Sequence, residues 1–344
     1  MTARSLPHTL VARLDSAGDV LLQGPAVRAL AAGSSRLTLL CGPRGRAAAE
    51  LLPDVDEVVE FRAEWIDPDP GPVSRPAVEE LVARIERLSP DLAVVLTSFH
   101  QSALPLALLL RLAGVPRTCA ISDDYPGALL DVRHRGVPDD VHEVERALSL
   151  ARAAGYELPP HDEGRLAMLV AERNPAAQRA PYVVVHPGAT VPARAWSPGA
   201  NRALVAALAA RGENVVVTGG PAERALCAYV AGNDATNLAG ATDFVTLARV
   251  IADADAIVVG NTGAAHVAAA VGTPVVSLFP PTIPAARFRP WMVPHVLLGD
   301  QQVACRGCRA RVCPFEDQPC LGVVRVDDVL AALAALRAAR EVPA

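Results

Sequence analysis

One stretch in the second half of the chain has the residue types of a phosphate-binding turn. An apolar run ends at Gly260, and Asn261 and Thr262 then precede Gly263 at the start of a predicted helix. Asn and Thr are good N-cap residues, and a glycine leaves the first amides of the helix accessible to an anion at the positive end of the helix dipole. His266 lies in the same first turn, where it could donate to a phosphate oxygen. A capped helix with a hydrogen-bonded core histidine explains the same pattern without a ligand.

Two further loops of the second half also follow apolar runs. His186 and Gly188 stand at the end of one run, and Arg194 comes shortly before the next helix, where it could neutralise a diphosphate. Gly219 and Glu223 follow the next run, and Glu223 could accept hydrogen bonds from a ribose or a base. Each charged residue has an ordinary alternative, Arg194 as a solvated loop residue and Glu223 as an acid in the first turn of a helix.

The first half of the chain contains a candidate general base. Asp19 follows Gly18 just after the first predicted strand, and the glycine allows a ligand to approach the backbone closely. A carboxylate in such a loop could take a proton from a substrate hydroxyl. The alternative is that Asp19 merely caps the helix that begins there. No G-x-G-x-x-G follows any predicted strand, which argues against a nicotinamide or flavin dehydrogenase.

Four cysteines fall within sixteen residues near the C-terminus: Cys305, Cys308, Cys313 and Cys320. In a reducing compartment such a cluster favours thiolate coordination of zinc or iron over disulfides. All four ligands would come from the protein, so the expected metal site is structural and has no open position. Reduced thiols, or disulfides formed after lysis, are the alternative.

Composition excludes several classes of function. Hydrophobic residues make up 51% of the 344 residues, which is enough for a large core, and the net charge of −5 argues against nucleic acid as a partner. The chain contains no lysine, which excludes Schiff-base chemistry and a P-loop lysine. We find no apolar run long enough to span a bilayer and no signal segment at residues 1–7, so we expect a cytoplasmic protein without a transmembrane segment.

Short apolar runs alternate with amphipathic stretches along the chain, which predicts parallel sheets covered by helices on both faces. In the first half the predicted strands are 9–14, 37–40, 55–61, 92–97 and 117–122, and the predicted helices are 20–31, 77–88 and 102–113. In the second half the predicted strands are 182–186, 214–218, 255–259 and 274–279, and the predicted helices are 198–211, 221–231, 263–271 and 327–340. The irregular stretch 156–180 is the expected linker between a domain at 1–155 and a second at 181–326, followed by a C-terminal helix within 327–344.

Taken in order, these motifs resemble glycosyltransferase family 9, the heptosyltransferase family. The resemblance runs from Arg13-Leu14 and Gly18-Asp19-Val20-Leu21 through His142-Glu143-Val144-Glu145-Arg146, His186-Pro187-Gly188-Ala189 and Arg194-x-Trp196 to the block 261–279. It implies a GT-B fold, an α/β architecture of two doubly wound Rossmann-like domains facing a central cleft. The N-terminal domain is then expected to bind the acceptor and the C-terminal domain the nucleotide sugar.

The resemblance also implies an activity: inverting transfer of a heptose-like sugar from a nucleotide-sugar donor, expected to be ADP-heptose, to a hydroxyl acceptor. This activity is expected to require no cofactor for catalysis. The resemblance assigns the catalytic base to Asp19 and acceptor binding to His142, the reserve candidate for the base. It assigns donor binding to Gly18, His186, Gly188, Arg194, Gly219, Glu223, Asn261, Thr262, Gly263 and His266. Asn261 departs from the aspartate usual in the family. The alternatives are a sugar-nucleotide epimerase or hydrolase on the same scaffold, or an inactive protein that binds nucleotide sugars.

Overall fold

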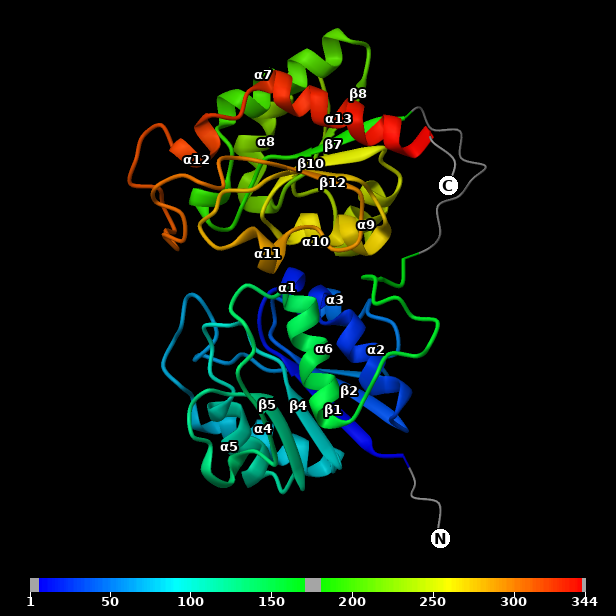
Figure 1. Cartoon of the computed structure of the whole chain (residues 1–344), viewed down its shortest axis with the longest axis vertical. Helices are drawn as coiled ribbons and strands as arrows, with labels where there is room; N and C mark the ends of the chain where they lie inside the picture. Colours follow the sequence, from blue (N-terminus) through cyan, green and yellow to red (C-terminus); the bar gives the residue numbers. More distant parts are fainter. Residues whose placement is uncertain (1–5, 171–180, 342–344) are drawn as a thin grey trace. The chain divides into compact units, whose positions relative to one another are not determined.

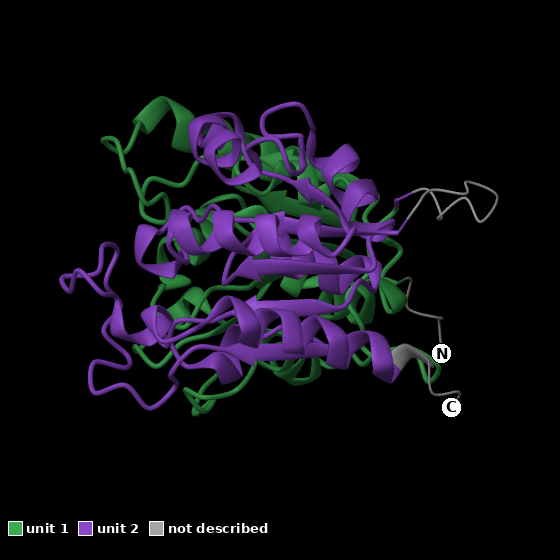
Figure 2. Ribbon diagram, turned by 90° about the horizontal axis from the view of Figure 1, so that it is seen from above, with its two compact units in different colours: residues 1–169 green, residues 170–344 purple. Residues whose placement is uncertain are grey.

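The computed structural model describes residues 6–170 and 181–341. The chain forms two compact units, residues 1–169 and 170–344 (Figures 1 and 2). Each unit contains one six-stranded sheet in which the paired strands run parallel. The predicted alternation of strands and helices around parallel sheets is therefore confirmed.

The sheet of the first unit has the strand order β3-β2-β1-β4-β5-β6. Its strands are β1 (His8–Arg13), β2 (Arg36–Cys41), β3 (Glu57–Glu60), β4 (Leu92–Val95), β5 (Arg117–Ile121) and β6 (Val132–His134). Its helices are α1 (Ala17–Leu22), α2 (Gly24–Ala32), α3 (Arg46–Ala49), α4 (Arg75–Leu88), α5 (Leu104–Leu112), the 3₁₀ turn η1 (Gly127–Leu129) and α6 (Glu143–Ala154). The order reverses between β1 and β4, and ligands of such sheets bind at the carboxyl ends of the strands on either side of the reversal.

The sheet of the second unit has the order β12-β11-β10-β7-β8-β9 and reverses between β7 and β10. Its strands are β7 (Tyr182–His186), β8 (Asn214–Val217), β9 (Thr236–Asn237), β10 (Ala256–Gly260), β11 (Val275–Leu278) and β12 (His295–Leu298). Its helices are η2 (Pro192–Arg194), α7 (Pro198–Ala210), η3 (Pro221–Glu223), α8 (Arg224–Ala231), α9 (Phe244–Ala252), α10 (Gly263–Val271), α11 (Ala285–Phe288), α12 (Pro319–Gly322) and α13 (Val326–Glu341).

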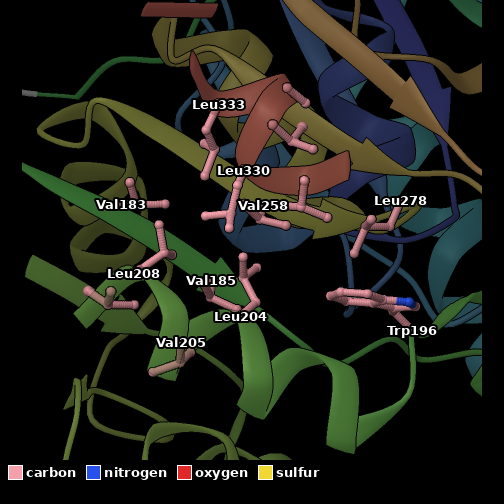
Figure 3. Close-up of a cluster of buried hydrophobic side chains, with 14 of the residues drawn as sticks. Val183, Val185, Trp196, Leu204, Val205, Leu208, Val258, Leu278, Leu330 and Leu333 are labelled. Atoms are coloured by element: carbon pink, nitrogen blue, oxygen red, sulfur yellow. The ribbon is translucent and has the colours of Figure 1, made fainter. Parts of the chain in front are cut away.

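Apolar strands buried on both faces hold each unit together, as a sheet covered by helices requires. In β1 the side chains of Leu10 and Val11 are completely buried. In the second unit, Val183 and Val185 of β7 belong to a cluster that also takes in residues of α7 and α13, and Figure 3 shows Trp196 within it. Trp196 is only 4% exposed, so it anchors the backbone just after the Arg194 turn.

The expected helix over residues 20–31 is wrong, because the chain forms the two helices α1 and α2 there. Gln23 separates them, and Pro25 lies in the first turn of α2. Proline has no backbone N–H and fits the first turn of a helix but not its interior, so it favours a new start. Helices α6 and α9 and strand β12 were not predicted from the apolar pattern.

Part of the expected linker 156–180 belongs to the first unit. Arg28 of α2 pairs with Asp162 at 2.6 Å, and the amide of Leu169 donates to the carbonyl of Leu51 at 2.7 Å. These contacts hold residues up to 169 on the first unit, whereas residues 171–180 lie outside the described residues. Among the described residues, none of the helices is long and apolar enough to cross a membrane.

Candidate active site

At the reversal point of the first sheet, a buried arginine gathers three carboxylates. Arg13 is the last residue of β1 and is 1% exposed. Its Nη2 lies 2.8 Å from Asp15 Oδ2 and 3.3 Å from Asp19 Oδ1, and its Nη1 lies 3.7 Å from Glu143 Oε2. Three acidic side chains therefore share one guanidinium.

The loop after β4 completes this arrangement, which we call the Arg13 cluster (Arg13, Asp15, Asp19, Ser98, Gln101 and Glu143). Arg13 Nη2 donates to Ser98 Oγ at 2.6 Å, and Gln101 Nε2 donates to Asp15 Oδ1 at 2.5 Å. The carboxyl ends of β1 and β4, which pair in the sheet, are thus joined by side-chain hydrogen bonds. Such bonds restrict the carboxylates to defined positions before any ligand arrives.

Asp19 is the carboxylate of this cluster that reaches solvent. Its side chain is 25% exposed, compared with 10% for Asp15 and 2% for Glu143. Ser16, and not Asp19, is the N-cap residue of α1, and its Oγ donates to Asp19 Oδ2 at 2.6 Å. The expectation that Asp19 could merely cap the helix is therefore not what the structure shows. Gly18 lies buried beside it in α1 of the first unit, whereas the other predicted donor residues belong to the second unit.

Burial and the opposite charges nearby shift the pKa values of this cluster in opposite directions. Burial raises the pKa of Asp15 although Arg13 lowers it, and burial raises the pKa of Glu143 against the lowering by Arg13 and Arg146. Burial alone lowers the pKa of Arg13, but the charges of Asp15, Asp19 and Glu143 raise it above its ordinary value. Arg13 therefore stays charged. Its charge opposes the effect of burial on Asp15 and Glu143, but the pKa of each acid remains raised.

His142 occupies a structural position. It is the N-cap residue of α6, its Nδ1 accepts a hydrogen bond from the amide of Val144 at 3.2 Å, and it is 2% exposed. Its predicted role in acceptor binding stays a prediction. The neighbouring Glu143 was missed as a site residue, although it lies in the motif that carried the family resemblance.

In the second unit the predicted donor residues gather at the corresponding place, the carboxyl ends of β7 and β10. His186 of β7 is level with Val259 of β10 in the sheet. Its Nδ1 lies 3.0 Å from Thr218 Oγ1, and burial lowers its pKa while Glu223 raises it. The net lowering favours a neutral imidazole at neutral pH.

Two glycines allow Glu223 to pack closely between neighbouring loops. Glu223 Oε2 accepts from the amide of Gly220 at 2.7 Å. A Cβ on Gly188 would overlap the Glu223 carboxylate, and one on Gly219 would lie 2.5 Å from Cys227 Sγ. The structure thus brings Gly188, Gly219 and Glu223 together, as a site built from these loops requires.

The first turn of α10 carries polar atoms that the described part of the protein does not satisfy. Thr262 is the N-cap residue, but its side chain makes no capping hydrogen bond. The buried atoms Asn261 Nδ2 and Thr262 Oγ1 have no hydrogen-bond partner among the described residues. Buried polar groups are usually hydrogen-bonded, so an unsatisfied pair beside the exposed Gly263 indicates a ligand site. His266 is 5% exposed, and its ring centroid lies 6.5 Å from that of Phe288.

Arg194 is carried by the 3₁₀ turn η2, which lies against the end of β10. A Cβ on Gly260 would come within 2.7 Å of the Arg194 carbonyl oxygen, so only glycine permits this approach without a shift. The fold therefore brings the Arg194 turn to the strand that leads into Asn261 and Thr262.

The four-thiolate metal site predicted for the cysteine segment stays a prediction. All four cysteines are free thiols, and Cys308 is exposed whereas Cys320 is buried. The pKa of Cys320 is raised first by burial and then by the charges of Cys313 and Cys305. Within residues 6–170 and 181–341, no group of three or more His, Cys, Asp or Glu side chains is placed to hold a metal ion.

Comparison with known proteins identifies the family. The model of glycosyltransferase family 9 (heptosyltransferase) matches residues 81–318, which is more than half of the chain. The chain belongs to this family. Its members are glycosyltransferase enzymes, so the family predicted from the ordered motifs is confirmed.

Two curated relatives match part of the chain. Lipopolysaccharide heptosyltransferase 3 of Escherichia coli is 36% identical over 116 residues, which cover 32% of this chain and 34% of that protein. Lipopolysaccharide heptosyltransferase 1 of Pseudomonas aeruginosa is 34% identical over 148 residues, which cover 42% of this chain and 41% of that protein. The chain thus spans about a third to two fifths of the length of these relatives.

Solved structures agree in fold. The E. coli ADP-heptose lipopolysaccharide heptosyltransferase II has a TM-score of 0.75 and 21% identity, with 97% of this chain and 100% of that chain covered. The iron-containing glycosyltransferase TibC of enterotoxigenic E. coli has a TM-score of 0.59 and 16% identity, with 99% of this chain and 78% of that chain covered. These similarities confirm the predicted α/β GT-B fold.

Proposed function

We propose that the protein is a heptosyltransferase that transfers a heptose from ADP-heptose to a hydroxyl group, with inversion at the anomeric carbon. Family membership supports sugar transfer, and the name of the E. coli structural relative supports ADP-heptose as the donor. One observation carries the proposal. The buried atoms Asn261 Nδ2 and Thr262 Oγ1 have no hydrogen-bond partner among the described residues, and they lie beside the amino end of α10. Helix amino ends bind phosphate groups through their unpaired amides and the helix dipole.

Three further side chains are assigned to the donor. Arg194 neutralises the diphosphate, for which a planar guanidinium is well suited because it can donate two parallel hydrogen bonds. His266, in the first turn of α10, donates to a phosphate oxygen. Glu223 already accepts from Gly220 through Oε2, so we assign its other oxygen to a ribose hydroxyl.

Asn261 supports an anionic ligand more strongly than the aspartate usual in the family. Its amide offers N–H donors and carries no charge, whereas an ionised aspartate would repel a diphosphate. The departure from the family pattern therefore favours phosphate binding at this turn.

Asp19 acts as the general base. It takes the proton of the acceptor hydroxyl as that oxygen forms a bond to the anomeric carbon. The bond from this carbon to the diphosphate oxygen breaks on the opposite face, and its electron pair leaves with ADP. Donors that are already in position stabilise this developing negative charge. Asp19 gains a proton and passes it to solvent after the product leaves.

Product analysis tests the activity against its alternatives. The protein is incubated with ADP-heptose and a heptose-free lipopolysaccharide core, and products are separated by mass and by anomeric NMR signals. ADP with a heptosylated acceptor of inverted configuration is expected. ADP with free heptose identifies a hydrolase, an isomeric ADP-sugar an epimerase, and binding without turnover an inactive binding protein. Any of these three results overturns the proposal.

Ligand binding tests the phosphate site without an acceptor. Calorimetry should show much tighter binding of ADP than of AMP, because the second phosphate adds the charge that Arg194 and α10 recognise. Arg194→Ala should remove most of this difference, whereas Arg211→Ala, at an exposed arginine of the same unit, should leave it unchanged. Equal affinities of the natural sequence for ADP and AMP would contradict the phosphate assignment.

We further propose that the cysteine segment binds zinc or iron in a purely structural role. The clustering of four thiols supports this, and TibC, of similar fold, is described as iron-containing. All four proposed ligands are cysteines of the chain, which leaves no open position on the metal, so we assign it no catalytic step. A cytoplasmic location also stays a prediction.

A further inference from the structure

The turn that carries Arg194 is hydrogen-bonded to a distant part of the chain. The amide of Ala193 donates to the carbonyl of Arg311 at 3.0 Å, and Gln318 Nε2 donates to the carbonyl of Ala193 at 2.9 Å. Ala193 is 4% exposed, so these bonds satisfy both backbone polar groups of a buried residue. Both partners lie between the first and last cysteines of the segment 305–320.

The same turn is confined on its other side. The Arg194 carbonyl lies against Gly260 at the end of β10, and Trp196 is buried in the core. Ala193, in the same turn, is joined to the cysteine segment by the hydrogen bonds of its amide and its carbonyl. The position of the Arg194 backbone therefore depends on the bonds to Arg311 and Gln318.

Gln318 holds a backbone conformation that glycine or asparagine would adopt more easily. Its φ is 43° and its ψ is 70°, in the left-handed region, where a residue with a long side chain is uncommon. Gln318 is the N-cap residue of α12, and its carbonyl accepts from the amides of Leu321 at 2.9 Å and Gly322 at 2.8 Å in that helix. The local turn needs only this backbone conformation, whereas reaching Ala193 needs the full length of the glutamine side chain.

We propose that Gln318 is a positioning residue of the donor site, which holds the Arg194 turn through the carbonyl of Ala193. This rests on the proposed function, in which Arg194 binds the donor diphosphate. Gln318 does not contact the donor. It sets the backbone from which the guanidinium extends, so its loss weakens recognition of the second phosphate and leaves the nucleoside contacts intact.

The variant Gln318→Asn distinguishes a role in positioning the Arg194 turn from a role in the stability of the fold. Asparagine tolerates the left-handed conformation better than glutamine but is one carbon shorter, so it keeps the turn and loses the reach to Ala193. We expect a melting temperature no lower than that of the natural sequence. The ratio of ADP to AMP affinity should fall roughly 3- to 10-fold, the equivalent of one hydrogen bond, with AMP affinity unchanged.

Gln301→Met is the matched control. Gln301 Nε2 also donates to backbone carbonyls, but to those of Phe279 at 2.7 Å and Gly299 at 3.3 Å rather than to one in the Arg194 turn. This variant should keep the ADP-to-AMP ratio even if its melting temperature falls. A second measurement places Gln318→Asn in the Arg194→Ala background, where it should have no further effect on the ratio because both changes act on one interaction.

The outcomes distinguish this inference from the proposed function. If Arg194→Ala leaves the ADP-to-AMP ratio unchanged, the phosphate assignment itself fails. If Arg194→Ala lowers the ratio but Gln318→Asn does not, only the positioning role is overturned. If Gln301→Met lowers the ratio as much as Gln318→Asn, a general loosening of the segment replaces the specific role of Gln318.

Discussion

Removing the charge of Arg13 should destabilise the first unit strongly. Arg13→Met keeps a long unbranched side chain but leaves Asp15 and Glu143 as buried carboxylates without their shared cation. Breaking a buried ion pair from one side costs about 3–5 kcal/mol, because an uncompensated charge stays buried. The short distance to Asp15, 2.8 Å, and the 1% exposure of Arg13 place the expected loss within that range.

Arg46→Met is the control on the same unit. Arg46 pairs with Glu50 at 2.9 Å, but both side chains are nearly half exposed. Exposed pairs within a helix contribute about 0.3–0.5 kcal/mol, so this variant should unfold almost like the natural sequence. Urea unfolding followed by circular dichroism, with separate transitions fitted for the two units, measures both variants.

The pH dependence of the loss identifies its cause. Burial raises the pKa values of Asp15 and Glu143, so their contribution to stability is complete below the unfolded-state pKa and is lost as the pH rises through the folded-state pKa. Without Arg13 both pKa values rise further. The difference in unfolding free energy between Arg13→Met and the natural sequence should therefore be larger at about pH 7.5 than at about pH 5. A loss no greater than that of Arg46→Met, or one that does not change with pH, would refute the reasoning.

Other consequences follow for the two sites. Asp19→Asn should bind ADP normally but turn over roughly 10²- to 10⁴-fold more slowly in steady-state assays, and near-normal turnover would exclude Asp19 as the base. Gly188→Ala should weaken ADP binding because its Cβ displaces the Glu223 carboxylate, whereas Gly199→Ala, with no atom near the added Cβ, should bind normally; equal affinities would disprove this packing. Elemental analysis should find about one zinc or iron per chain, lowered by Cys308→Ser, and a metal-free natural protein with four titratable thiols would rule out coordination.

The sequence allowed the fold to be predicted well where apolar strands were long and buried. Parallel strands covered on both faces consist of continuous apolar runs, and β7 and β10 were placed correctly for that reason. Strand β12 was missed because all four of its residues are only partly buried and the run is short. Helix α6 was missed because its charged first turn conceals an apolar face.

The donor loops were predictable because each motif is local. Gly188 and Thr262 come two residues after the ends of β7 and β10, and Glu223 comes six residues after the end of β8. The parallel sheet then brings these strand ends together. The Arg13 cluster could not be predicted in the same way, because Glu143 is 130 residues from Arg13 in the sequence. Arg13 belongs to the motif that carried the family resemblance, but arginine is rarely buried, so the motif did not suggest that Arg13 would organise three carboxylates.

The groups at the points where the strand order reverses differ in kind between the two sheets, and the proposed transfer uses both kinds. In the first unit a single guanidinium is shared by three carboxylates, and Asp19, the most exposed of them, is suited to accept a proton. In the second unit Asn261 and Thr262 offer polar atoms beside a helix amino end, which suits a group that gains negative charge. Sugar transfer needs both functions, since the acceptor loses a proton while the leaving diphosphate gains charge. An epimerase or hydrolase also needs a nucleotide site and a base, so the products formed, and not the Arg13 cluster, separate these activities from transfer.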